Sequence, residues 1–244
     1  MFKLRNHQLA ILNTLQQNSK GQVIVPTGGG KTICMIEDAK YQFQFNSVSK
    51  TIVVVAPRIL LAQQLCADFL ELIDNVHVLH VHSGETHHTS TTKIDLIKQW
   101  VGDNVGNKII FTTYHSLHKL MESDVFVDTI YFDEAHNGVQ KNFVEAVEYH
   151  SMYANRCYFF TATPKHSKTP FKIGMNDQDI FGRVLVNVPA PKLVDEGVIL
   201  PPKVRIKKID VVDDSRFKHE HDCDHVVSTM DEIGVDKILI CARS

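Results

Sequence analysis

A glycine-rich stretch near the start of the chain has the residue types that hold phosphate groups. It reads Pro26-Thr27-Gly28-Gly29-Gly30-Lys31-Thr32 and lies between an apolar run at 22–25 and a helix-like segment. Consecutive glycines let backbone N–H groups approach a pyrophosphate, and the next helix N-terminus adds partial positive charge. Lys31 is expected to reach the β- and γ-phosphates and Thr32 to bind magnesium. The pattern predicts a nucleoside triphosphate site (a P-loop); the alternative is a plain strand-to-helix turn.

An acidic pair farther along the chain has the residue types for metal binding and hydrolysis. Asp133-Glu134-Ala135-His136 follows the apolar run at 129–132. One carboxylate at a strand end can hold magnesium, and the next can position and deprotonate an attacking water. We expect Asp133 in the first role and Glu134 in the second. Alone, this tetrapeptide could be a capped turn before a helix; with the P-loop it favours hydrolysis of a nucleotide.

Apolar runs alternate with helix-like segments over most of the chain. Near-continuous apolar strands are expected where helices cover both faces of a sheet. Strands that alternate with helices predict an α/β fold with a mainly parallel sheet, whose binding rim is at the carboxyl ends of the strands. The predicted strands are 22–25, 51–55, 108–111, 129–132 and 156–160, and the predicted helices are 32–45, 59–73, 92–100 and 142–150.

The character of the sequence changes near Asn187, where prolines become frequent. We expect a nucleotide-binding domain at 1–187, a linker at 188–202 that contains a short helix at 192–196, and a second α/β domain at 203–244. Its expected elements are a strand at 203–212, a helix at 226–233 and a strand at 237–241. Because the sequence stops soon after that strand, the second domain is expected to be truncated.

Composition excludes several protein classes. Lys and Arg total 26 and Asp and Glu total 28, so the formal net charge of −2 is unlike that of a polycation. A local patch can still bind phosphates. No apolar run approaches the roughly 18 residues that span a bilayer, and residues 1–7 lack the core of a signal peptide. Five scattered cysteines without a Cys-x-x-Cys pair favour an intracellular, reducing compartment, cytoplasm or nucleus/nucleoid.

In order, these motifs resemble those of superfamily 2 DEAH-motif helicases and translocases, of the restriction-enzyme and DNA-repair type. The resemblance implies a RecA-like fold with ATP and magnesium as cofactors. Leu4-Arg5-Asn6-His7-Gln8 resembles the glutamine motif, in which Arg5 and Gln8 would contact the nucleotide, with Gln8 at the adenine. Residues 133–136 resemble motif II, which makes His136 a candidate catalytic residue. Thr161-Ala162-Thr163-Pro164 resembles motif III, and Thr161 and Thr163 would couple ATP to the nucleic acid through His136.

The same resemblance implies a path for a nucleic-acid strand. Residues 56–64 resemble motif Ia and residues 112–117 resemble motif Ib, while Ser83 and Gly84 form a small turn near the strand. Arg58, Thr112 and Thr113 are expected to contact backbone phosphates and sugars, which positions a strand without reading its sequence. Nothing resembles a base-reading element or a recognised RNA module. Double-stranded or forked DNA is favoured because the resemblance is to DNA-acting restriction and repair translocases; RNA stays open.

One family motif is missing. No Gln-x-x-Gly-Arg-x-x-Arg pattern, which supplies the arginines of motif VI, occurs in the sequence. Such arginines can contribute several powers of ten in rate. The chain alone is therefore expected to bind ATP better than it hydrolyses it. Two alternatives are an ATP-binding scaffold without catalysis and another P-loop enzyme, such as a kinase or a GTP switch.

Histidines are numerous, 14 in all. The run His219-Glu220-His221-Asp222-Cys223-Asp224-His225 could hold zinc through His221, Cys223 and His225. We favour a solvated acidic loop before a helix, because no Cys-x-x-Cys pair lies elsewhere. The histidines at 80, 82, 87 and 88 flank the Ser83–Gly84 turn and are expected at the surface.

Overall fold

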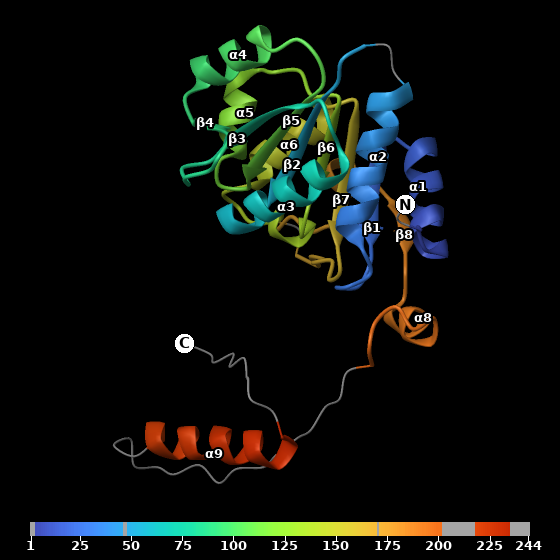
Figure 1. Cartoon of the computed structure of the whole chain (residues 1–244), viewed down its shortest axis with the longest axis vertical. Helices are drawn as coiled ribbons and strands as arrows, with labels where there is room; N and C mark the ends of the chain where they lie inside the picture. Colours follow the sequence, from blue (N-terminus) through green and yellow to red (C-terminus); the bar gives the residue numbers. More distant parts are fainter. Residues whose placement is uncertain (1–2, 46–47, 170, 202–217, 235–244) are drawn as a thin grey trace. The chain divides into compact units, whose positions relative to one another are not determined.

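A computed structural model describes residues 3–45, 48–169, 171–201 and 218–234 (Figure 1). Residues 1–201 form one compact unit and residues 202–244 a second. In the second unit the described element is α9 (Lys218–Ile233). The strands predicted at 203–212 and 237–241 lie outside the described residues. The expected start of a helix at 226 was too late, because α9 already includes the histidine-rich run that we expected to be a loop.

The first unit is built on one sheet in which every neighbouring pair of described strands is parallel. The strand order is β4-β3-β5-β2-β6-β7-β1-β8. This confirms the parallel α/β fold, and the five predicted strands correspond to β1, β2, β5, β6 and β7. The strands are β1 (Lys20–Ile24), β2 (Thr51–Ala56), β3 (His77–Val81), β4 (Thr89–Ser90), β5 (Lys108–Thr113), β6 (Thr129–Phe132), β7 (Arg156–Thr161) and β8 (Val184–Asn187).

Two hydrophobic cores lie on opposite faces of this sheet. Along β2 the side chains of Ile52 and Val54 enter one core, and those of Val53 and Val55 enter the other. All four are fully buried, and each such side chain stabilises the fold by about 1.5–3 kcal/mol. A strand that is apolar on both faces can only lie inside a covered sheet, which is why this β-branched run forms the central strand.

The helices divide between the two faces according to the core that they enter (Figure 1). Those predicted at 32–45, 59–73, 92–100, 142–150 and 192–196 correspond to α2, α3, α4, α6 and α8. One face is covered by α1 (Asn6–Gln17), α2 (Lys31–Phe45), α3 (Ile59–Leu72) and α8 (Ala190–Asp195), and the other by α4 (Ile94–Asp103), α5 (Leu117–Ser123), α6 (Val144–Tyr153) and α7 (Gln178–Phe181).

The helix α8 lies inside the first unit, although the sequence placed it in a linker. Leu193 is fully buried in the same core as β1 and α2. Residues up to Pro201 belong to this unit. None of the described helices has the length and apolar character that crossing a membrane requires.

Candidate nucleotide-binding site

The glycine-rich loop joins β1 to α2 and has a backbone that only glycine allows. Gly28 and Gly30 have φ angles of 79° and 83°, in the left-handed region where other residues are strained. At Gly29 a Cβ atom would lie 2.5 Å from Val25 Cγ1. The three glycines therefore leave a space lined by backbone, here called the cradle, which a side chain at any of these positions would occupy. It stands at the N-terminus of α2, which fits the phosphates of a nucleotide.

Lys31 extends from this loop toward the acidic pair. Its side chain is only 9% exposed, and Nζ lies 3.4 Å from the Val25 carbonyl oxygen and 3.8 Å from Glu134 Oε1. Both contacts are long for a charged donor, so phosphate oxygens could replace them. The strands that precede the loop and the pair, β1 and β6, both flank β7. Their carboxyl ends bring together two motifs that the sequence predicted separately.

Backbone contacts hold the acidic pair at the end of β6. The Asp133 N–H donates to the Val55 carbonyl at 2.9 Å, and the Tyr114 hydroxyl donates to the Asp133 carbonyl at 2.9 Å. Glu134 has a φ of 45° and a ψ of 54°, a left-handed conformation that costs about 1–3 kcal/mol. This strained turn directs the Glu134 side chain to Lys31. The sequence did not single out Tyr114.

Burial raises the pKa of the Asp133 carboxyl to about 6; the nearby Glu134 adds to the rise, and Lys31 opposes it. A divalent cation would favour the charged form of this carboxyl. Asp133 and the half-buried Thr32, in the first turn of α2, offer the oxygen ligands that magnesium prefers. The residues present thus fit magnesium, and its binding by Thr32 and Asp133 stays a prediction.

A single hydrogen bond links motif II to motif III. His136 Nδ1 lies 3.0 Å from Thr161 Oγ1, and the Thr163 N–H donates to the same oxygen at 3.2 Å. Glu134 Oε2 is 3.4 Å from His136 Nδ1. Burial lowers the pKa of His136, with Lys165 and Lys31 contributing and Glu134 opposing, which favours the neutral ring. Thr161 is buried at the end of β7, whereas Thr163 is exposed.

The N-terminal helix packs against the cradle through the glutamine motif. Gln8 is 2% exposed, and its Oε1 accepts from the Arg5 N–H at 2.8 Å. A Cβ atom on Gly30 would collide with Gln8 Nε2. Arg5 is exposed. His7, which the sequence did not single out, has Nε2 2.8 Å from the Gly29 carbonyl oxygen; only its place between Arg5 and Gln8 could have drawn attention to it.

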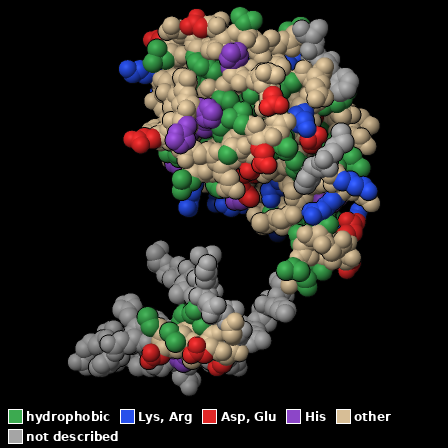
Figure 2. All heavy atoms as spheres, viewed as in Figure 1, with side chains coloured by type: hydrophobic (Ala, Val, Ile, Leu, Met, Phe, Trp, Pro, Cys, Tyr) green, Lys and Arg blue, Asp and Glu red, His purple; other side chains and the backbone are tan. Residues whose placement is uncertain are grey.

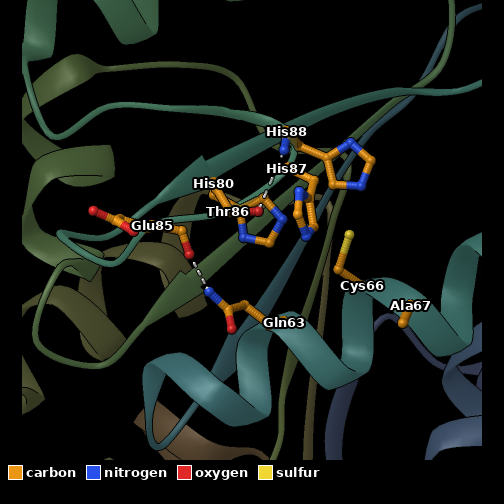
Figure 3. A pocket seen from close by; sticks show the side chains of 8 residues that line it. All are labelled: Gln63, Cys66, Ala67, His80, Glu85, Thr86, His87 and His88. Atoms are coloured by element: carbon orange, nitrogen blue, oxygen red, sulfur yellow. Dashed lines mark hydrogen bonds between the residues drawn. The ribbon is translucent and has the colours of Figure 1, made fainter.

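Motif Ia and the glycine turn meet at the start of α3. Arg58 and Ser83 are both exposed, and a Cβ atom on Gly84 would collide with the side chain of Ile59. Gln63 Nε2 donates to the Glu85 carbonyl, which ties the turn to α3 (Figure 3). Three of the predicted nucleic-acid residues therefore lie near one another on the rim.

Two other predicted nucleic-acid contacts do not lie on this surface. Thr112 is fully buried and Thr113 is 4% exposed, and Thr112 Oγ1 donates to the Val81 carbonyl at 2.9 Å. The expectation that their side chains touch a phosphate backbone is not met in this structure, because β5 lies between β3 and β2 and both residues still belong to the strand. In motif Ib, His115 is the exposed residue that follows them.

The histidines around the turn divide into buried and exposed ones. His87 and His88 are exposed as expected, and Figure 2 shows histidine side chains gathered on the surface over β3. His80 and His82 are buried, against expectation, with His80 Nδ1 3.0 Å from His82 Nε2. Burial, with His82 and His88 nearby, lowers the pKa of His80 to about 4. His80 lines a pocket of about 460 Å³ with α3 and the 85–88 loop (Figure 3).

No histidine cluster forms a metal site among the described residues. They contain no group of three His, Cys, Asp or Glu side chains that could hold an ion. In the histidine-rich run of α9, Cys223 is exposed, and the side chains at 219–222 lie outside the described residues.

The family model described as "Type III restriction enzyme, res subunit" matches residues 1–166, which include the cradle, the acidic pair and motif III. The chain belongs to this family. A comparison with curated proteins found no match.

Solved structures similar to this res-subunit family member share its fold. A nuclease-deletion mutant of the Type ISP restriction-modification enzyme LlaGI, in complex with a DNA substrate mimic, is 20% identical with a TM-score of 0.69; the match covers 81% of this chain and 21% of that one. The Pyrococcus furiosus Hef helicase domain is 22% identical with a TM-score of 0.55, covering 74% and 37%. These structures share the RecA-like parallel α/β fold of the first unit, and this chain spans about a fifth of LlaGI.

Proposed function

We propose that this chain is the ATP-binding motor domain of an ATP-driven helicase or translocase that acts on DNA. The observation that carries the proposal is the meeting of Lys31 and Glu134, 3.8 Å apart, at the mouth of a cradle built from three required glycines. A phosphate-binding lysine beside a carboxylate that can activate water is the arrangement that hydrolysis of a nucleoside triphosphate needs.

The residues of the site would divide the work as follows. Bound magnesium ATP supplies the phosphoanhydride bond whose cleavage releases free energy. The N–H groups of the 28–30 backbone hold the phosphates, and Lys31 leaves Glu134 to bind them. Glu134 then accepts the proton of the attacking water. Thr32 and Asp133 would supply oxygen ligands to magnesium.

Different residues would contact the adenosine part of the nucleotide and couple its hydrolysis to the nucleic acid. Gln8 lies beside the cradle, and we propose that Gln8 and the exposed Arg5 contact the nucleotide, with Gln8 at the adenine. His136 Nδ1 lies 3.4 Å from Glu134 Oε2 and 3.0 Å from Thr161 Oγ1. A movement of Glu134 during hydrolysis can therefore shift His136 and Thr161. The exposed Thr163 of the same motif III would transmit this shift to the bound nucleic-acid strand.

Arg58, Ser83 and Gly84 form the proposed strand contact. DNA is the proposed partner because LlaGI is in complex with a DNA substrate mimic and a second similar Type ISP enzyme, LlaBIII, is bound to DNA. Phosphate contacts of this kind position a strand and weaken with salt. RNA is the alternative partner, and the experiment below separates the two.

We propose that residues 188–202, which pack on the first unit up to Pro201, connect it to a second RecA-like domain that starts at 203–244. Because the motif VI pattern is absent from these 244 residues, we expect weak hydrolysis by the chain alone. Cys34, Cys66, Cys157 and Cys223 are free thiols, which supports an intracellular location.

A GTP switch is the weaker alternative. Thr92-Lys93-Ile94-Asp95 fits the guanine-selecting pattern Asn/Thr-Lys-x-Asp. This segment follows β4, the edge strand, whereas the cradle follows β1 near the opposite edge. It is therefore remote from the base of any nucleotide that the cradle holds.

The test is nucleotide turnover by the 244-residue chain with no nucleic acid, with double-stranded DNA and with RNA. We expect slow ATP hydrolysis that DNA stimulates more than RNA does, and no preference for GTP. Stronger stimulation by RNA would change the proposed partner. ATP binding without turnover under all conditions would support the scaffold, and preferred turnover of GTP or of a small acceptor would support another P-loop enzyme.

A further inference from the structure

The segment after β8 packs directly on the phosphate cradle. Leu193 of α8 is fully buried, and its Cδ1 would lie 3.1 Å from a Cβ atom on Gly29. Ile199 Cγ2 would lie 3.2 Å from a Cβ atom on Gly28. The chain turns back after α8, since Val198 and Ile199 both donate their N–H groups to the Leu193 carbonyl at 2.8 and 3.3 Å. Residues 190–199, the α8 segment, thus form one wall of the cradle.

His7 stands between the cradle and this segment. It is 3% exposed, and Nε2 lies 2.8 Å from the Gly29 carbonyl oxygen. A carbonyl only accepts hydrogen bonds, so Nε2 carries the proton. The other ring nitrogen, Nδ1, is buried without a hydrogen-bond partner and lies 4.0 Å from Glu196 Oε2. A buried, unpartnered nitrogen is costly.

Glu196 is placed to complete the contact. Its Oε1 lies 3.9 Å from Lys192 Nζ, on the same helix, while Oε2 faces His7. A shift of about 1 Å would bring Oε2 within hydrogen-bond distance of Nδ1. The doubly protonated ring could then donate to both Gly29 and Glu196, and the second bond would be charge-assisted.

We propose that His7 is a positioning residue that couples the phosphate cradle to the α8 segment through Gly29 and Glu196. Phosphates bound at the cradle fix its backbone, and a fixed cradle holds the α8 segment through His7, Leu193 and Ile199. Coupling between two sites is reciprocal, so the docked segment must in turn strengthen nucleotide binding. The state of the nucleotide site is thereby passed to the part of the chain that leads out of the first unit. The inference rests on nucleotide binding as proposed above.

The first test measures the affinity of the 244-residue chain for a fluorescent, non-hydrolysable ATP analogue with magnesium. Glu196→Ala should weaken binding about fivefold or more, although residue 196 is exposed and need not touch the nucleotide. Asp195→Ala, which removes an exposed carboxylate from the neighbouring position, is the matched control and should leave affinity within twofold. His7→Ala combined with Glu196→Ala should be no weaker than His7→Ala alone, because both changes break one connection.

The second test follows hydrogen exchange of residues 190–199 with and without the analogue. The wild type should exchange more slowly when nucleotide is bound, and Glu196→Ala should lose most of this protection while keeping its melting temperature. Unchanged affinity and unchanged protection in Glu196→Ala would overturn the coupling while nucleotide binding stands. A wild type that binds no nucleotide would overturn the proposed function and the coupling with it.

Discussion

The ammonium group of Lys31 and the carboxylate of Glu134 face each other, with 3.8 Å between Nζ and Oε1. One belongs to the loop after β1 and the other to the turn after β6, and β7 lies between these strands. In this arrangement Lys31 holds the carboxylate that would act as the base. Phosphates that attract Lys31 would release Glu134, so nucleotide binding itself would prepare the general base.

Glu134→Gln tests the role of this carboxylate. The amide keeps the size of the side chain but cannot accept a proton from water, so turnover should fall by about 10²-fold or more. Affinity for magnesium ATP should stay within about twofold. Steady-state turnover and calorimetric titration check the two parts. Glu122→Gln, at an exposed position of α5, should change neither, and normal turnover by Glu134→Gln would remove Glu134 from the base role.

Asp133→Asn should weaken the dependence of binding on magnesium and stabilise the nucleotide-free fold. The pKa of Asp133 is raised to about 6 from an ordinary value of 3.8. The folded chain therefore binds the proton more tightly than the unfolded chain, and ionisation destabilises the fold as the pH rises from 3.8 to 6. Above pH 6 the full cost is about 3 kcal/mol, which the amide would avoid.

Urea unfolding of both proteins across the pH range measures this effect. The gain in the free energy of unfolding should be full at pH 7–8, about half at pH 5, and should disappear toward pH 3.8. A gain that is equal at pH 7.5 and pH 4 would show that ionisation of Asp133 is not its source.

Thr161→Val should separate hydrolysis from its coupling to nucleic acid. Valine has a similar shape but cannot bond to His136 or accept the Thr163 N–H, as the hydroxyl does at 3.0 and 3.2 Å. We expect turnover without DNA to be nearly unchanged and stimulation by DNA to be largely lost. Stimulation equal to that of the wild type would show that this hydroxyl is not the link. Thr163→Val, measured in parallel, reports on the exposed hydroxyl.

Arg58→Ala should weaken binding to a DNA strand of any sequence, because phosphate contacts carry no sequence information. The slope of log affinity against log salt should become shallower by about one. Fluorescence anisotropy at several salt concentrations measures both. The control is Lys98→Ala, which removes an exposed charge from α4 on the other face of the sheet; an equal effect of the two changes would argue against a strand path over α3.

The central strands and the nucleotide motifs could be predicted because their signals are local. The run at 51–55 is apolar on both faces, and the three glycines stand directly before Lys31 and Thr32. β3 escaped prediction because its histidines broke the apolar pattern, although His80 is buried beside Phe111. A sequence pattern cannot show that a polar ring finds its partner inside the protein.

The misplaced site residues have a related cause. Thr112 comes directly after the predicted strand at 108–111 and was expected to contact a nucleic-acid backbone, yet its hydroxyl donates to the Val81 carbonyl of the adjacent strand. His7 contacts Gly29 and faces Glu196, from parts of the chain far apart in sequence. Such contacts depend on tertiary packing, which the spacing of residues along the chain does not encode.

The most direct test of the central claim is calorimetric titration of magnesium ATP into the wild type and Lys31→Ala. Lys31 lies at the cradle and contacts Glu134 and the Val25 carbonyl, so its removal should leave the fold and the melting temperature essentially intact. We predict a measurable dissociation constant for the wild type and no detectable binding for Lys31→Ala. Binding of ATP by Lys31→Ala with the affinity of the wild type would contradict the assignment of the cradle as the nucleotide site.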